Sequence, residues 1–237
     1  NIEYRALLLA AGLGSRLKPH TNFKPKCLMN IGGKPLLEYW LKNLENSHCK
    51  EVLINTHYLS EQVFNFLQKR PKTNMRIKTI YEKELLGTAG TLMKNITFFK
   101  KDLGLMIHAD NFALLDLNKF VRAHLERNKN TTITMATFLS NNPTSCGIVE
   151  TDNNQVLLDF IEKPTNPKSS LANAAIYAFG DEFLKEFMKL DNPYDFSKDV
   201  IDKFKGKIQT WLTNEILIDI GTPDSLAKAQ AFVLPKN

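Results

Sequence analysis

Short apolar runs alternate with amphipathic segments over the first 140 residues, and this alternation limits the possible folds more than any other feature of the sequence. The run at 4–9 (YRALLL) is typical of a buried strand, and the segment at 36–46 (LLEYWLKNLEN) places its large apolar side chains on one stripe of a helix. Strand followed by helix, repeated, predicts a Rossmann-like three-layer α/β/α fold with a mixed, mostly parallel central sheet. The expected strands are 4–9, 51–55, 75–81, 103–108 and 131–138, and the expected helices are 36–46, 60–68 (with Ser60 as its N-cap), 89–98 and 117–127.

The pattern changes after residue 140. Two apolar runs, 147–150 and 156–162, flank a polar turn at 152–154, which predicts a β-hairpin. Because no low-complexity linker interrupts the chain, we expect one domain over 1–237, in which 141–237 extends the same sheet and forms the second wall of a pocket. Further strands are expected at 173–179, 208–211 and 216–219, and further helices at 183–190, 196–204 and 223–232.

Cysteine usage and net charge narrow the class of protein only in part. Cys27, Cys49 and Cys146 are far apart and form no CxxC pair, so neither a disulfide framework nor a zinc site is predicted.

No apolar run reaches the roughly 20 residues of a membrane span, and the first strand begins too early for a signal peptide. We therefore expect a cytoplasmic protein that does not bind membranes. The net charge of +6 fits a small polyanionic substrate, a nucleic acid or a membrane surface equally well.

The stretch AAGLGSR at 10–16 follows the first expected strand, at the sheet edge where α/β proteins bind ligands. It is not a dinucleotide-binding fingerprint, because Leu17 occupies the third glycine position and the second strand ends in Asn55 instead of an acidic residue. The phosphate-binding loop G-x-x-x-x-G-K-[ST] is also absent. The turn therefore belongs to neither of these two nucleotide-binding classes.

The chemistry of this turn nevertheless favours a phosphate ligand. Gly12 and Gly14 leave backbone N–H groups uncovered, Arg16 can form a fork on phosphate oxygens, and Lys26 can add a point charge. These residues predict a polyphosphate lying across the turn. An ordinary glycine-containing connection with solvated lysines explains the same residues, so both interpretations stay open at this point.

The stretch LAAGLGSRLKPHTNFKPKCLMNIGGKPLLEY resembles the signature of the sugar-1-phosphate nucleotidylyltransferases, G-x-G-x-R-L-x-P-x-T…P-K-x-L…P-L. The resemblance implies the nucleotide-diphospho-sugar transferase type of fold, with a nucleotide-binding half at 1–140 and a sugar-phosphate-binding half at 141–237. It also implies that Ala11 and Asn111, like the turn glycines, contact substrate. The signature positions matched are Gly12, Gly14, Arg16, Leu17, Pro19, Thr21, Pro25, Lys26, Leu28, Pro35 and Leu36.

The stretch ELLGTAG at 84–90 corresponds by this resemblance to the loop that reads the nucleobase. Glu82, Gly87 and Thr88 are then expected to face the base. An ordinary helix start with Thr88 as its cap is the alternative, and both can hold together. The loop is more similar to that of mannose- or heptose-1-phosphate guanylyltransferases than to the thymidylyltransferase loop, which favours GTP.

Two acidic residues are implied as ligands of Mg²⁺, a cation that takes oxygen ligands and bridges phosphates. Asp110 lies in HADN, after an expected strand, and Asp219 lies in ILIDIGTP near the end of the sequence. An isolated Asp after a strand is more often a turn former, so the metal site rests on the resemblance. Leu217 stands where many members of the family have Trp.

The sugar-phosphate site is implied by three stretches of the second half. In IEKP, Glu162 would contact sugar hydroxyls and Lys163 the sugar phosphate, although a solvated ion pair is the ordinary explanation of such a dipeptide. In LANAAIYAF, Asn173 would hydrogen-bond the sugar, and Ala175 stands where many members of the family have Gly. Gly147 would approach the sugar ring.

The implied reaction joins a nucleoside triphosphate to a sugar 1-phosphate and releases pyrophosphate. A phosphate oxygen attacks directly, so catalysis consists of positioning and charge neutralisation by Arg16, Lys26, Lys163 and a magnesium ion on Asp110. A cytidylyl-, uridylyl- or thymidylyltransferase acting on an unusual sugar or phosphorylated alcohol, and a non-catalytic nucleotide-binding module, are the alternatives. Scattered lysines argue against nucleic-acid binding. A monomer and a homodimer both remain possible.

Overall fold

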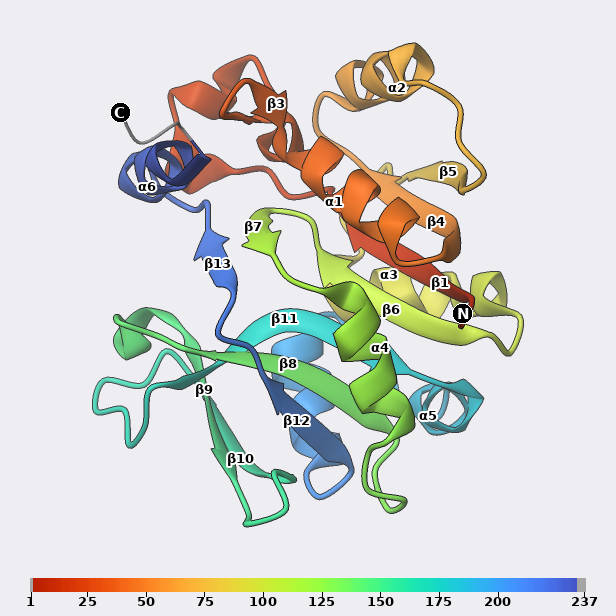
Figure 1. Ribbon diagram of the computed structural model, residues 1–237, viewed down its shortest axis with the longest axis vertical. Helices are drawn as coiled ribbons and strands as arrows, with labels where there is room; N and C mark the ends of the chain where they lie inside the picture. The colour runs from red at the N-terminus through yellow and green to blue at the C-terminus, as the bar shows by residue number, and fades with distance from the viewer. Residues whose placement is uncertain (1, 234–237) are drawn as a thin grey trace. The chain divides into compact units, whose positions relative to one another are not determined.

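The computed structural model describes residues 2–233 and has a mixed α/β fold, which confirms the predicted class (Figure 1). Within these residues the chain divides into two compact units. Unit 1 contains residues 2–5, 86–107 and 116–214, and unit 2 contains residues 6–85, 108–115 and 215–233. No helix among residues 2–233 combines the length and apolar character that crossing a bilayer requires.

The sheet of unit 2 has the strand order β1 (Tyr4–Leu9), β4 (Cys49–Thr56), β5 (Arg76–Tyr81), with β1 entering the unit at residue 6. β1 is buried along its whole length, as its unbroken apolar run predicts. β4 and β5 are parallel neighbours, as the intervening helix α2 (Ser60–Lys69) requires. Helix α1 (Leu36–Asn46) buries the predicted apolar stripe.

The end of the chain returns to unit 2. Strand β13 (Ile216–Asp219) pairs antiparallel with β7 (Asn111–Leu114), and helix α6 (Pro223–Val233) packs against the short hairpin of β2 (Asn30–Ile31) and β3 (Lys34–Pro35) (Figure 1). The last segment therefore folds with the early residues of unit 2. One buried apolar cluster joins these early and late parts of the chain: Leu17, Met29, Ile31, Leu36, Phe112, Ile220, Leu226 and Ala229.

The sheet of unit 1 is built around β11 (Leu171–Phe179), which pairs antiparallel with β6 (Leu103–His108) on one side and β8 (Ile133–Leu139) on the other. β12 (Ile208–Leu212) adds to β8 in parallel. Residues 116–140 therefore belong to the same compact unit as the later strands β11 and β12.

The predicted hairpin is present as β9 (Gly147–Thr151) and β10 (Leu157–Glu162), which pair antiparallel (Figure 1). β9 also pairs with β11 through Ala172 and Ile148. This contact connects the hairpin to the sheet of unit 1.

The helices of unit 1 are α3 (Gly87–Lys94), α4 (Leu117–Leu125) and α5 (Asp181–Phe187). The predicted helix at 196–204 is a π-type turn at Phe196–Val200 followed by a 3₁₀ turn at Ile201–Phe204. Aromatic packing holds this irregular segment, because the Phe183 ring lies between the rings of Phe196 and Phe204.

Several predicted boundaries need correction. Helix α3 begins at residue 87 instead of 89 and stops at 94, where a 3₁₀ turn at Ile96–Phe99 follows. Ser60 is not the cap of α2, because Leu59 occupies that position in a left-handed conformation. Three strands, β2, β3 and β7, were not predicted. They are two to four residues long, which is too short to show an alternation of apolar and polar residues.

Candidate active site

The glycine turn after β1 folds back on itself through three 3₁₀ turns. Gly14 has a φ of +61°, and a Cβ atom there would lie 2.8 Å from Cγ2 of Thr21 and 3.2 Å from Cβ of Lys26. The Thr21 hydroxyl donates a hydrogen bond to the Gly14 carbonyl over 2.8 Å. Only glycine fits this crowded left-handed position. The absence of a side chain at residue 14 lets Lys26 lie directly beside the turn. The three turns are Ser15–Leu17, His20–Asn22 and Lys26–Leu28.

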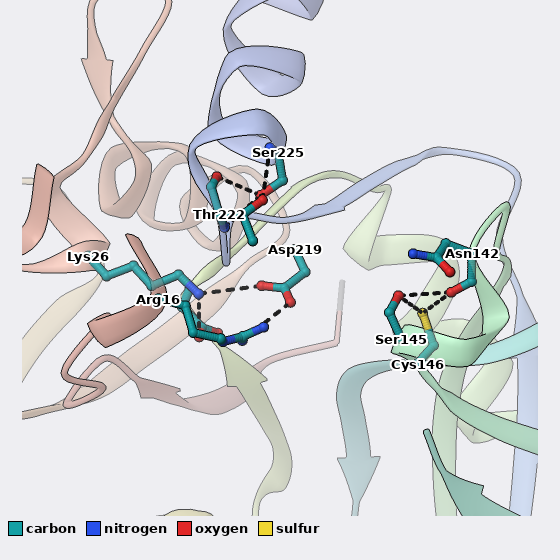
Figure 2. Close-up of polar contacts among 9 residues, drawn as sticks. Arg16, Lys26, Asn142, Ser145, Cys146, Asp219, Thr222 and Ser225 are labelled. Carbon is teal, nitrogen blue, oxygen red and sulfur yellow. Dashed lines mark hydrogen bonds and ion pairs between the residues drawn. The ribbon is translucent and has the colours of Figure 1, made fainter. Parts of the chain in front are cut away.

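Lys26 lies between the two acidic residues that the sequence implied as metal ligands. Its Nζ is 2.9 Å from Oδ2 of Asp110 and 3.4 Å from Oδ1 of Asp219. Arg16 approaches the other oxygen of Asp219, with Nη2 3.8 Å from Oδ2. Figure 2 shows the Lys26 and Arg16 side chains pointing toward Asp219. The structure thus brings four of the predicted residues together.

Strand pairing places the two carboxylates near each other. Asp110 immediately precedes β7, and Asp219 is the last residue of β13, where it pairs with Asn111. Asn111 is buried, and its carbonyl accepts a 2.8 Å hydrogen bond from Nε1 of Trp40 on α1. This pairing is long-range in sequence, so local sequence patterns alone could not predict the convergence.

Electrostatics favour the ionised form of Asp110. Burial raises the pKa of its carboxyl group, but the Lys26 ammonium, His108 and hydrogen bonds outweigh burial and hold the pKa below its usual range. Burial raises the pKa of the neighbouring Cys27 thiol to about 12, so this cysteine is a neutral core residue and not a nucleophile.

A cavity of about 290 Å³ opens beside these charges. Its volume and the two cations in its lining, Arg16 and Lys26, suit part of a small anionic ligand. The residues that line it are Leu13, Gly14, Ser15, Arg16, Lys26, Leu85, Asp110 and Gly221.

The carboxylate oxygens of Asp110 and Asp219 are of the kind that magnesium prefers as ligands. Asp110 and Asp219 already converge on one cation, the Lys26 ammonium. Among residues 2–233 no cluster of three or more His, Cys, Asp or Glu side chains could enclose a metal. Two carboxylates suit Mg²⁺, which usually keeps several waters and takes its remaining ligands from phosphates.

Glu82 occupies a buried position at the ends of β4 and β5. Its Oε1 accepts a 3.1 Å hydrogen bond from Nδ2 of Asn55, whose own Oδ1 accepts from the Ala10 N–H over 2.7 Å. Nδ1 of His57 lies 2.8 Å from the Glu82 carbonyl. The amide of Asn55 thereby links the glycine turn to Glu82, a connection that the sequence analysis did not include.

Gly87 and Thr88 are contacted by their own chain. Gly87 has a φ of +74°, and a Cβ atom there would overlap the backbone carbonyl of Tyr194. That carbonyl accepts a 2.9 Å hydrogen bond from the Ala89 N–H, and the Thr88 hydroxyl accepts a 2.7 Å hydrogen bond from the Phe196 N–H. The alternative role of Thr88 as helix cap is wrong, because α3 is capped by Leu86 without a side-chain hydrogen bond.

The predicted sugar-phosphate residues cluster around the β9–β10 hairpin. Gly147 pairs with Glu162, and a Cβ atom on Gly147 would lie 2.8 Å from Oε2 of Glu162. Burial raises the pKa of Glu162. Lys163 follows in a left-handed conformation with φ +47°, and its N–H donates a 3.0 Å hydrogen bond to the Cys146 carbonyl.

Asn173 forms a bulge in β11. Its Oδ1 accepts from the Ala175 N–H over 2.9 Å, and its Nδ2 donates to the Tyr177 hydroxyl over 2.7 Å. Ala175 has a φ of +55°, which explains why glycine suits this position in other members of the family. Tyr177 is fully buried and was not predicted as a site residue.

The predicted site residues thus fall in two groups. Those of unit 2 surround the glycine turn and the two carboxylates, and those of unit 1 lie on the β9–β10 hairpin, on β11 and at the start of α3. The first group is Ala11, Gly12, Gly14, Arg16, Lys26, Glu82, Asp110, Asn111 and Asp219, and the second is Gly87, Thr88, Gly147, Glu162, Lys163 and Asn173.

Comparison with known proteins gives curated relatives along nearly the whole chain. The mannose-1-phosphate guanylyltransferase catalytic subunit beta of Drosophila melanogaster is 29% identical over 97% of this chain and 63% of its own length. A glucose-1-phosphate adenylyltransferase of Bacillus thuringiensis is 29% identical over 97% of this chain and 67% of its own. The chain therefore spans about half to two thirds of the length of the curated relatives it matches.

A solved structure shares the fold. The crystal structure of HddC from Yersinia pseudotuberculosis complexed with GMP-PN superposes with a TM-score of 0.82, at 24% identity, over 98% of this chain and all of that one. A family model described as nucleotidyl transferase matches residues 5–236. The chain belongs to the nucleotidyl transferase family.

Proposed function

We propose that the protein joins a nucleoside triphosphate to a sugar 1-phosphate, giving a nucleotide sugar and pyrophosphate. The observation that carries this proposal is the position of Lys26 between Asp110 and Asp219, beside a glycine turn that carries Arg16. Positively charged side chains gathered in one place can neutralise the charge of two anionic substrates and so allow them to react. Relatives named as guanylyl- and adenylyltransferases of sugar 1-phosphates support the same reaction class.

The attacking group is an oxygen of the sugar phosphate, which is already ionised near neutral pH. It attacks the α-phosphorus of the triphosphate, a P–O bond forms, and the bond to pyrophosphate breaks. No protein nucleophile is required, which agrees with the raised pKa of the Cys27 thiol. The protein's contribution is to hold the two anions in line and to neutralise their charge.

Each charged residue has a role in this scheme. Arg16 would bind the β- and γ-phosphates, Lys26 the α-phosphate, and Lys163 the sugar phosphate. Asp110 and Asp219 would hold Mg²⁺, which would neutralise phosphate charge when bound.

We further propose GTP as the preferred triphosphate. Glu82 carries a carboxylate that can only accept hydrogen bonds, and guanine presents adjacent N–H donors on its Watson–Crick edge. The Drosophila relative is named as a guanylyltransferase, which agrees with this choice. The Bacillus relative is named as an adenylyltransferase, so ATP is the competing candidate.

A matrix of five triphosphates (ATP, GTP, CTP, UTP and dTTP) against several sugar 1-phosphates, with and without Mg²⁺, tests the proposal by pyrophosphate release. We expect magnesium-dependent turnover that is fastest with GTP. Lys26→Ala should reduce kcat by roughly 10²–10³-fold, as expected for loss of one preorganised charge. Lys34→Ala is the matched control, because Lys34 is an exposed lysine of the same unit. Tight triphosphate binding without pyrophosphate release would instead indicate a non-catalytic binding module.

A further inference from the structure

We propose that Lys26 and Arg16 occupy the carboxylates of the metal site until triphosphate draws them away, so that the site holds a divalent cation only weakly before nucleotide arrives. This inference rests on the proposed function, because it concerns the same residues. It adds an order of events. The carboxylates bind a metal tightly only after Lys26 and Arg16 have left them, and these two side chains leave only when phosphate oxygens are present to bind them.

The first observation is the position of the Lys26 ammonium. It lies within hydrogen-bond distance of Asp110 and 3.4 Å from Asp219, and the Lys26 side chain is only 5% exposed. A buried ammonium needs a counter-charge, and Asp110 and Asp219 both lie close enough to supply it. Lys26 therefore already occupies the point where both carboxylates converge.

The second observation concerns the remaining oxygen of Asp219. Oδ1 faces Lys26, and Oδ2 faces Arg16 at 3.8 Å. Each oxygen of this carboxylate therefore has a positively charged side chain beside it. A divalent cation approaching Asp219 would meet repulsion from either side, and one of the two protein cations has to move before it can bind.

Lys26 and Arg16 also line the cavity beside the glycine turn. A triphosphate in that cavity brings several negative charges to the same two side chains, and phosphate oxygens bind guanidinium and ammonium groups well. As Lys26 and Arg16 turn toward the phosphates, Asp110 and Asp219 lose their counter-ions. The carboxylates then favour a new cation, and the phosphates can supply its other ligands.

Direct measurement of Mn²⁺ binding to the nucleotide-free protein tests this inference without relying on turnover. Titrations followed by electron paramagnetic resonance should show weak binding to the wild type. Lys26→Met removes the competing charge with little change in volume, and we expect it to bind Mn²⁺ at least about tenfold more tightly. Arg16→Met should have a smaller effect, because the Arg16 side chain is 64% exposed and its contact is longer.

Two comparisons make the result decisive. The double variant Lys26→Met with Asp110→Asn should lose the gained binding, and Mn²⁺ should raise the Tm of Lys26→Met more than that of the wild type. Equal or weaker Mn²⁺ binding by Lys26→Met would overturn the inference, as would gained binding that survives in the double variant. If the wild type releases no pyrophosphate with any substrate pair, the proposed function fails independently of these titrations.

Discussion

His124 provides a sharp test of how burial controls charge in this protein. It lies on the inner face of α4, is 2% exposed, and its Nδ1 is 2.8 Å from the hydroxyl of Thr134 on β8. Burial lowers the pKa of His124 to about 3, and the nearby Arg127 guanidinium contributes in the same direction. The imidazole is therefore neutral in the folded protein throughout the mildly acidic range.

The stability consequence follows from linkage. In the unfolded chain His124 titrates near pH 6.5, so below that pH the unfolded state binds a proton that the native state does not. The folded protein consequently loses stability as the pH falls from about 6.5 toward 3. The slope approaches about 1.4 kcal/mol per pH unit, and the loss between pH 7 and pH 5 is about 2 kcal/mol.

Urea denaturation of the wild type and His124→Gln at pH 7 and pH 5 measures this contribution. Gln keeps a hydrogen-bonding group for Thr134 but does not titrate. Other acidic and histidine groups contribute equally to both proteins, so only the difference in pH dependence is interpreted. We expect the wild type to lose about 2 kcal/mol more than the variant over this interval. Equal pH dependence of the two proteins would refute the reasoning.

Two further substitutions test features of the fold. Gly87→Ala should destabilise the protein by about 2 kcal/mol or more in urea denaturation, because residue 87 has a left-handed backbone and faces the carbonyl of Tyr194. An unchanged urea midpoint would contradict this close approach. Arg70→Met should lower the free energy of unfolding by about 3–5 kcal/mol, because the nearly buried guanidinium forms ion pairs with both Glu38 and Glu45. A decrease below about 1 kcal/mol would show that these ion pairs behave like exposed surface pairs.

Local periodicity was sufficient to predict the bounds of β1 and α1. β1 and α1 begin and end where the apolar pattern predicts, because one is buried on all sides and the other buries a single stripe. It was not sufficient at 196–204, where the spacing looks helical but aromatic packing produces a π-type turn followed by a 3₁₀ turn. Non-local contacts override propensity in that segment.

The charged residues that converge beside the glycine turn all lie in motifs of the sequence, but no motif predicts their geometry. The signature motif contains Arg16 and Lys26, and the acidic motifs contain Asp110 and Asp219. No local pattern indicates that β13 pairs with β7, and this pairing is what brings the two carboxylates onto one ammonium. The position of Lys26 between Asp110 and Asp219 depends on that long-range contact.

Gly14 and Gly87 show a further feature that the motifs alone could not predict. Both are expected beside a ligand, and the structure shows in addition that other segments of the chain lie against them. Thr21 and Lys26 crowd Gly14, and the backbone of Tyr194 crowds Gly87. These glycines therefore allow neighbouring segments to lie close enough to fix the polar groups of each unit. A glycine in a binding motif can thus be required because the chain itself packs against it.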